Sequence, residues 1–289
     1  MMKSALLASL VVAACLWPIH ALAQSEPPLV QPTPEPSLQA PFDNQWHASI
    51  TPYIWAPGIS GNLVFYHPAL VGTGAASIGV ATGPSNYLSF INSAAMVAGE
   101  VRKNAFDVSA DLIFLNMSQT GANTVTITGP AGNVQIPVTA AVGWHLNTTM
   151  WELQPGLVVG HGEAGTAIVF TGVRSVSMRT SANWTFTGPI NLVPLTGSDS
   201  ESQTITDWLV GVRGKVNLGG RWFIPLYQDV GWGNANTTTT QFYGGLGYAE
   251  HWGNILLMYR QLFYDQTTST ARLRGLELNG LTLGATINL

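Results

Sequence analysis

The chain has 289 residues, of which only 9% are charged, against about 25% in an ordinary soluble domain. Its net charge of −4 offers no basic surface suited to nucleic acid, so we expect no nucleic-acid partner. After the N-terminus, no apolar run reaches the roughly 18 residues that a membrane-spanning helix needs. Low charge together with 10 tryptophans and 31 glycines favours a barrel that crosses a membrane with strands.

Residues 1–23 are typical of a secretory signal peptide. Lys3 supplies the positive charge, residues 5–17 form the apolar stretch, and Ala21-Leu22-Ala23 is an A-x-A cleavage site. The only cysteine, Cys15, lies in this leader, so no disulfide is expected in the mature protein. The residues just before Cys15 also resemble a lipobox, which leaves lipidation of that cysteine as an alternative.

Residues 24–45 contain six prolines and predict a proline-rich periplasmic tether without a core of its own. The barrel is predicted to occupy residues 46–289. Throughout this region apolar and polar residues alternate with a period of two, which indicates strands. The alternation is clearest in Thr204–Trp232, where one face carries tryptophan and valine and the other carries charge and glycine. Apolar residues outside and charges inside are typical of a membrane barrel, whereas a soluble β-sandwich, the alternative, would reverse them.

The pattern predicts an all-β, antiparallel up-and-down transmembrane β-barrel of ten strands, with eight or twelve left open by the segment 118–147. The strands are expected at 46–56, 91–102, 105–116, 149–160, 166–180, 204–216, 221–232, 241–250, 255–264 and 281–289.

Short and long connections alternate between these strands. Residues 67–86 are expected to form a Gly/Ser/Pro-rich connection, 118–147 a hairpin that stands out of the membrane, and 181–202 a polar loop. Short turns lie periplasmically and long loops outside in outer-membrane barrels. This arrangement, with an even number of strands, predicts that both termini are periplasmic.

The chain resembles a family of small β-barrels of Gram-negative outer membranes, OmpA- and OmpW-like in architecture. The resemblance spans most of 46–289, and its carrying residues are Thr51–Trp55, Pro57-Gly58, Ser60-Gly61, Asp107–Phe114, Asp207–Lys215, Arg221–Phe223, Gly244–Tyr248, Tyr259-Arg260 and Leu281–Leu289. It implies an outer-membrane location and the barrel fold, and no activity. The chain departs from the family at Leu289, where such barrels mostly end in phenylalanine.

Twelve charged residues are predicted to face the barrel interior and to form a charge network. They are Glu100, Arg102, Asp107, Asp111, Glu152, Arg174, Asp207, Arg213, Lys215, Arg221, Asp229 and Arg260. Strands near 100–111 and 207–221 lie on opposite sides of a ten-stranded barrel. An acidic arc (Glu100, Asp107 and Asp111) should therefore face a basic arc (Arg213, Lys215 and Arg221) across the lumen.

Two functions follow from this arrangement. If the arcs touch, their ion pairs fill the lumen, and the protein is a closed barrel with an anchoring role and surface loops available for binding. If water separates them, the barrel is a narrow porin-like channel for small polar solutes. Ten strands leave little room beyond what side chains fill, which favours the closed form.

Tryptophans near the predicted strand ends are expected to mark the membrane interfaces. They are Trp46, Trp151, Trp208, Trp222, Trp232 and Trp252. The predicted partners are outer-membrane lipid, lipopolysaccharide and, through the C-terminal strand, the barrel assembly machinery. We expect a monomer.

No nucleotide-binding loop, metal-ligand spacing or calcium loop occurs, so no cofactor, metal or enzymatic activity is expected. A lipid-acting hydrolase is the second alternative function, since outer-membrane barrels include acyl hydrolases. It would need a serine, a histidine and a carboxylate near one rim. Its candidates are His145 near Asn147 and Glu152, with Ser118 within reach.

Overall fold

A computed structural model describes residues 42–65, 76–128, 135–187, 196–233, 237–266 and 273–289. The predicted signal peptide, Cys15 and most of the predicted tether lie outside these residues. All described residues belong to one compact unit, Pro36–Leu289. Within the described chain no helix has the length and apolarity to span a membrane.

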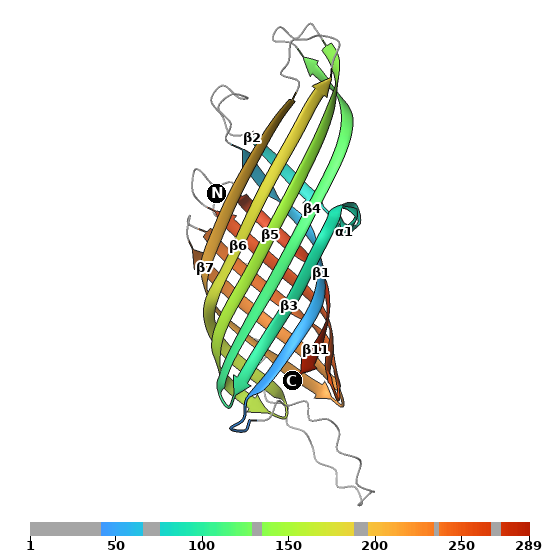
Figure 1. Ribbon diagram of the computed structural model, residues 1–289. Helices are drawn as coiled ribbons and strands as arrows, with labels where there is room; N and C mark the ends of the chain where they lie inside the picture. Colours follow the sequence, from blue (N-terminus) through green and yellow to red (C-terminus); the bar gives the residue numbers. More distant parts are fainter. Residues whose placement is uncertain (1–41, 66–75, 129–134, 188–195, 234–236, 267–272) are drawn as a thin grey trace, which may run out of the picture. The chain divides into compact units, whose positions relative to one another are not determined.

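The described residues form a closed antiparallel β-barrel of ten strands, which confirms the predicted fold class (Figure 1). Each barrel strand pairs with its neighbours in the sequence, and β1 pairs with β11 to close the wall. The strands are β1 (His47–Phe65), β3 (Ile91–Lys103), β4 (Phe106–Thr128), β5 (Gln135–Gly162), β6 (Gly165–Thr187), β7 (Thr196–Gly219), β8 (Trp222–Gly233), β9 (Thr237–Glu250), β10 (Gly253–Gln266) and β11 (Leu273–Asn288).

Side chains alternate strictly between the two faces of the wall. In β7, Trp208 is 69% exposed while the next residue, Leu209, is fully buried. The valines at 210, 212 and 216 are exposed like Trp208, whereas Asp207 and Arg213 are buried. The apolar face predicted for Thr204–Trp232 therefore lies outside the barrel, and its charged face lies inside.

The four predicted short turns lie together at one end of the barrel. The turns β3–β4, β5–β6, β7–β8 and β9–β10 lie at one end, called here the short-turn end. Positive φ angles tighten two of them, at Asn104 (51°) and Gly220 (56°). Both ends of the barrel chain lie there too, because Ser49 is paired with Asn288. The opposite end is called the long-loop end.

Strands β4 to β7 continue towards the long-loop end beyond their last pairs with β3 and β8 (Figure 1). The prediction of a polar loop at 181–202 is therefore wrong, since β6 runs to Thr187 and β7 begins at Thr196. The predicted hairpin over 118–147 is present, as the extension of β4 and β5. These extensions, 118–128, 135–145, 181–187 and 196–200, are called the protruding sheet.

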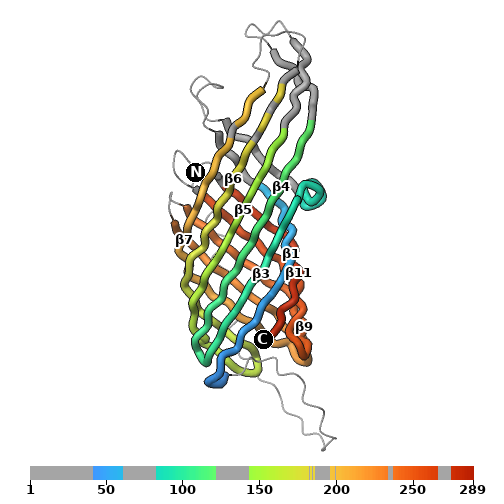
Figure 2. Tube along the Cα trace, in the orientation of Figure 1, coloured from blue at the N-terminus to red at the C-terminus, as the bar shows by residue number. Residues whose placement is uncertain are grey.

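One wall strand is interrupted. The predicted connection at 67–86 contains a strand, β2 (Ala76–Thr82), followed by α1 (Pro84–Tyr87) and the 3₁₀ turn η2 (Leu88–Phe90). β2 pairs with the upper part of β1, and β3 pairs with its lower part. β2 and β3 thus occupy one wall position in turn. The coil of α1 lies beside the end of β3 (Figure 1 and Figure 2).

Candidate functional site

The barrel interior holds a cluster of charged side chains nearest the short-turn end. Asp107, fully buried on β4, accepts a hydrogen bond from Nε of Arg102 at 3.2 Å and pairs across the lumen with Arg213 of β7. Arg102 also donates to Glu100 at 2.7 Å. The structure therefore joins one member of the predicted acidic arc to one member of the basic arc.

A second charged cluster lies further up the interior, around two buried arginines. Arg174 donates through Nε to Glu152 at 2.7 Å and pairs with Asp229 of β8. Arg260 donates through Nη1 to Asp111 at 3.0 Å, and its Nη2 lies 3.6 Å from Glu152. Glu152 thus receives both arginines, which gives the second cluster a shared centre.

Uncharged polar groups join the two clusters into one network. Gln154 accepts from Arg213 at 3.0 Å and donates to Glu152 at 2.6 Å and to the hydroxyl of Tyr227 at 2.8 Å. Gln241 accepts from Arg260, and Tyr53 donates to Asp111 at 2.6 Å. Among the barrel strands, only β11 contributes no side chain to the hydrogen bonds described for this network.

The polar members Tyr53, Gln154, Tyr227 and Gln241 were not among the predicted site residues. Their positions follow the same alternation that placed the charges inside. The two-residue period is therefore sufficient to place these uncharged polar residues inside, as it is for the charged ones.

Stacked aromatic rings line the interior beside the network. Tyr227 stacks on Tyr243 with ring centroids 4.5 Å apart and on Phe170 at 5.3 Å. The Arg213 guanidinium lies over the Phe170 ring at 5.4 Å. Flat rings and cations in contact fill space that water would otherwise occupy.

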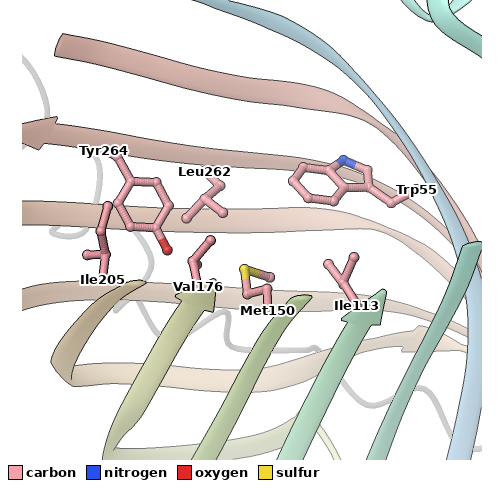
Figure 3. Close-up of a cluster of buried hydrophobic side chains, with 7 residues drawn as sticks. All are labelled: Trp55, Ile113, Met150, Val176, Ile205, Leu262 and Tyr264. Atoms are coloured by element: carbon pink, nitrogen blue, oxygen red, sulfur yellow. The ribbon is translucent and has the colours of Figure 1, made fainter. Parts of the chain in front are cut away.

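An apolar layer crosses the interior on the long-loop side of the network. Figure 3 shows its buried side chains: Trp55, Ile113, Met150, Val176, Ile205, Leu262 and Tyr264. Arg260 lies 4.8 Å from the Trp55 ring and so joins the apolar layer to the charged one. Sequence reasoning missed this layer, because inward apolar residues do not stand out from the outward ones in composition.

A cavity of about 470 Å³ reaches from the short-turn end up to the second cluster, where Asp111, Glu152 and Arg260 line it. Its lining includes Arg102, Arg213, Lys215, Glu100 and Tyr243. Lys215 lies over the ring of Phe223 at 5.4 Å. The lumen is therefore hollow from the short-turn end up to the second cluster.

Two predicted members of the network are placed differently. Arg221 lies at the short-turn rim, half exposed, and pairs with Glu250 at 3.3 Å instead of facing the acidic arc. Asp207 is inside and 1% exposed, but neither carboxylate oxygen has a hydrogen-bond partner among the described residues. Arg174 is its register neighbour on β6, yet directs its guanidinium to Glu152 and Asp229.

The six tryptophans predicted at strand ends are all exposed. Trp46 precedes β1, Trp222 begins β8, Trp232 is next to its last residue, and Trp252 lies in the β9–β10 turn. The strand-end prediction is wrong for the other two, Trp151 and Trp208, because β5 and β7 extend into the protruding sheet.

The candidates for a hydrolase do not converge. Ser118 and His145 are register partners on β4 and β5, but Ser118 accepts a hydrogen bond from Asn92. Glu152 lies inside the barrel, whereas His145 is exposed at a position of opposite parity in the same strand. Within the described chain, no group of three His, Cys, Asp or Glu residues could hold a metal ion.

Comparison with known proteins finds no matching family model and no matching curated protein. Among solved structures, the chain is similar to the translocator domain of autotransporter NalP from Neisseria meningitidis, with 12% identity, a TM-score of 0.37, and coverage of 83% of this chain and 88% of that one. A FadL homologue of Pseudomonas aeruginosa gives 12% identity, a TM-score of 0.26, and coverage of 85% and 89%. An anion-selective porin from Comamonas acidovorans gives 8% identity, a TM-score of 0.22, and coverage of 85% and 100%.

Proposed function

We propose that this protein is an integral outer-membrane β-barrel of a Gram-negative bacterium, with its lumen closed and an anchoring role. The outer face supports the membrane placement. Its exposed side chains include Trp208, Val210, Leu257 and Leu283, while the buried charges point inward. In water such a surface would be costly, whereas lipid accepts it.

The two ends of the barrel support an orientation with periplasmic termini. Outer-membrane barrels keep short turns in the periplasm and longer loops outside. The short-turn end holds both ends of the described barrel chain, so the protruding sheet would stand on the cell surface. There the protein would meet lipopolysaccharide, and its C-terminal strand β11 would be the part read by the barrel assembly machinery. We propose a monomer, since the wall closes on itself.

The closed lumen is the central part of the proposal, and one observation carries it. The Arg174–Asp229 and Arg213–Asp107 pairs join strands that are not neighbours, so they cross the interior instead of following the wall. The apolar layer covers the long-loop side of the network. A hydrated ion would have to displace both layers to pass.

A closed barrel that carries a protruding sheet suits an anchor for surface binding. The runner-up is a narrow channel for small polar solutes, which the cavity favours because it extends from the short-turn end as far as the second cluster. We propose no enzymatic activity.

Single-channel recording in planar bilayers tests the proposal. The wild-type protein should insert without stable conductance steps. The double variant Arg174→Ala, Glu152→Ala removes one positive and one negative charge from the centre of the network, and it should conduct. Stable steps from the wild type that change in Arg213→Glu would refute the closed barrel and establish the channel.

A further inference from the structure

The ladder between β1 and its neighbour on the β3 side is interrupted in the middle of the wall. Pairing with β3 ends at Pro52↔Val97, and pairing with β2 begins at Ile59↔Thr82. Between these pairs, residues 53–58 of β1 have no ladder partner on that side among the described residues. Their pairing with β11 on the other side continues, and β3 stays paired with β4. This interrupted boundary, 53–58 of β1 against 91–96 of β3, is called the seam.

Side chains replace the missing ladder at the seam. The backbone N–H of Trp55 donates to the sulfur of Met96 at 3.1 Å. Pro57 has no N–H to satisfy, and its carbonyl oxygen accepts from the hydroxyl of Tyr87 in α1. A strand boundary in lipid must satisfy its backbone groups. Here a thioether binds the Trp55 N–H and a phenol binds the Pro57 carbonyl, so these two contacts can part by moving two side chains instead of breaking a ladder.

The interior directly behind the seam is apolar. Trp55 belongs to the apolar layer, and Met96 packs against that layer. Two more methionines lie in this layer, with Met150 buried and Met178 partly buried. Methionine side chains are flexible, so they can change their packing to fit a flexible ligand.

Two buried hydrogen-bond donors lie in the same layer. Trp55 Nε1 and the Tyr264 hydroxyl are buried, and neither has a hydrogen-bond partner among the described residues. The two side chains are 5% and 3% exposed. Buried donors of this kind are rare in proteins unless something else binds them. An apolar layer with free donors suits an apolar chain that carries an acceptor oxygen.

We propose that the seam is a lateral entrance from the bilayer to the apolar layer, and that the layer binds a linear acyl chain with a carbonyl or carboxylate group. The chain would displace Met96 at the seam and lie among the methionines, with its oxygen on Trp55 Nε1 or the Tyr264 hydroxyl. This inference rests on the proposed membrane placement, and it is independent of whether ions cross the lumen.

Equilibrium dialysis tests the site. It measures how palmitic acid binds to the purified full chain in a non-ionic detergent. A second arm uses nanodiscs of dipalmitoyl phosphatidylglycerol and native mass spectrometry. One bound palmitic acid per barrel supports a free fatty acid as ligand, and a retained phospholipid with no palmitic acid binding supports the acyl chain of a bilayer lipid. Trp55→Phe should weaken binding about fivefold, because one hydrogen bond is lost. Absence of both ligands would overturn the proposal.

A cross-link tests the route. Ile54 and Ala95, both exposed, would face each other if the register of Pro52↔Val97 continued. Joining them as cysteines with a short bifunctional thiol reagent should slow association about tenfold, because the opening step is blocked. The matched control joins Ala48 and Val101, a true ladder pair of the same two strands, and should leave the rate unchanged.

Each double variant without its cross-link shows whether the substitutions alone disturb folding, and it must bind like the wild type for the comparison to count. Equal rates in the two cross-linked variants would refute entry at the seam. A failure of these binding tests leaves the conductance result unaffected, so the two proposals fail separately.

Discussion

Replacing Arg174 with methionine measures how strongly the network holds the barrel together. The guanidinium is fully enclosed and contacts Glu152, Asp229 and Thr239. Methionine keeps a long apolar side chain. The carboxylates of Glu152 and Asp229 then stay buried without the positive charge and hydrogen bonds of Arg174. Removing one partner of a buried ion pair costs about 3–5 kcal/mol. We expect the free energy of unfolding to fall by about that amount.

Arg221→Met is the matched control for this change. Arg221 forms an ion pair with Glu250 at 3.3 Å, but its side chain is 40% exposed at the short-turn rim. Exposed pairs contribute about 0–1 kcal/mol, so this variant should unfold almost like the wild type. Arg174→Lys should be intermediate, since an ammonium keeps the charge and loses the forked hydrogen bonding.

The assay is equilibrium urea unfolding in lipid vesicles, followed by tryptophan fluorescence, with slope and midpoint compared between variants. Equal losses in Arg174→Met and Arg221→Met would refute the reasoning, because enclosure would then make no difference. If Arg174→Met is as stable as the wild type, the carboxylates of Glu152 and Asp229 are hydrated. That result would also refute the closed lumen.

Three further outcomes are expected. Asp207→Asn should raise the free energy of unfolding by about 1 kcal/mol or leave it unchanged, since it removes a buried charge without a hydrogen-bond partner among the described residues. Asp229→Asn should lower the free energy of unfolding by about 3 kcal/mol, because Asp229 is paired with Arg174. Urea unfolding of both variants measures the difference. Gly245→Ala should lower it by about 1–3 kcal/mol, because an added Cβ would lie 2.1 Å from a carbonyl oxygen of β10, and a variant as stable as the wild type would contradict that contact. The hydrogen bond with His47 lowers the pKa of the Asp43 carboxyl below 3.8, so an NMR titration should show this pKa rise in His47→Ala, and an unchanged value would rule the contact out.

The fold could be predicted because one physical signal repeats in every barrel strand. Neighbours such as Trp208 and Leu209 lie on opposite faces, and the charges of Asp207 and Arg213 on the inner face show which solvent each face suits. The same signal was overlooked in 181–187, where Ala182, Trp184 and Phe186 alternate with polar residues, and it is absent from 196–202, where one face carries serine and threonine and the other glycine and acids. There the strands continue because neighbouring strands extend the ladder, which a single segment does not reveal.

The interior could be predicted in composition but not in pairing. Parity placed Arg213 and Asp107 inside, and their heights put them within reach of each other. The height of each residue also depends on the stagger between strands, which the sequence pattern leaves open. For that reason the sequence did not predict that Arg221 pairs with Glu250 at the rim. It also did not predict that Arg174, beside Asp207, directs its guanidinium to other carboxylates.

The order of the two interior layers bears on both proposals. The cavity admits water to the short-turn side of the network, so Glu100 and Arg102 can be hydrated, while Arg174 lies deeper and is fully enclosed. The apolar layer then covers the network on the other side, where a charge has no partner to reach. An ion from the long-loop end meets this layer first and gains nothing from entering it. An acyl chain loses nothing there, and the seam opens at this same height. The layer that excludes ions along the axis is therefore the layer best suited to accept lipid from the side.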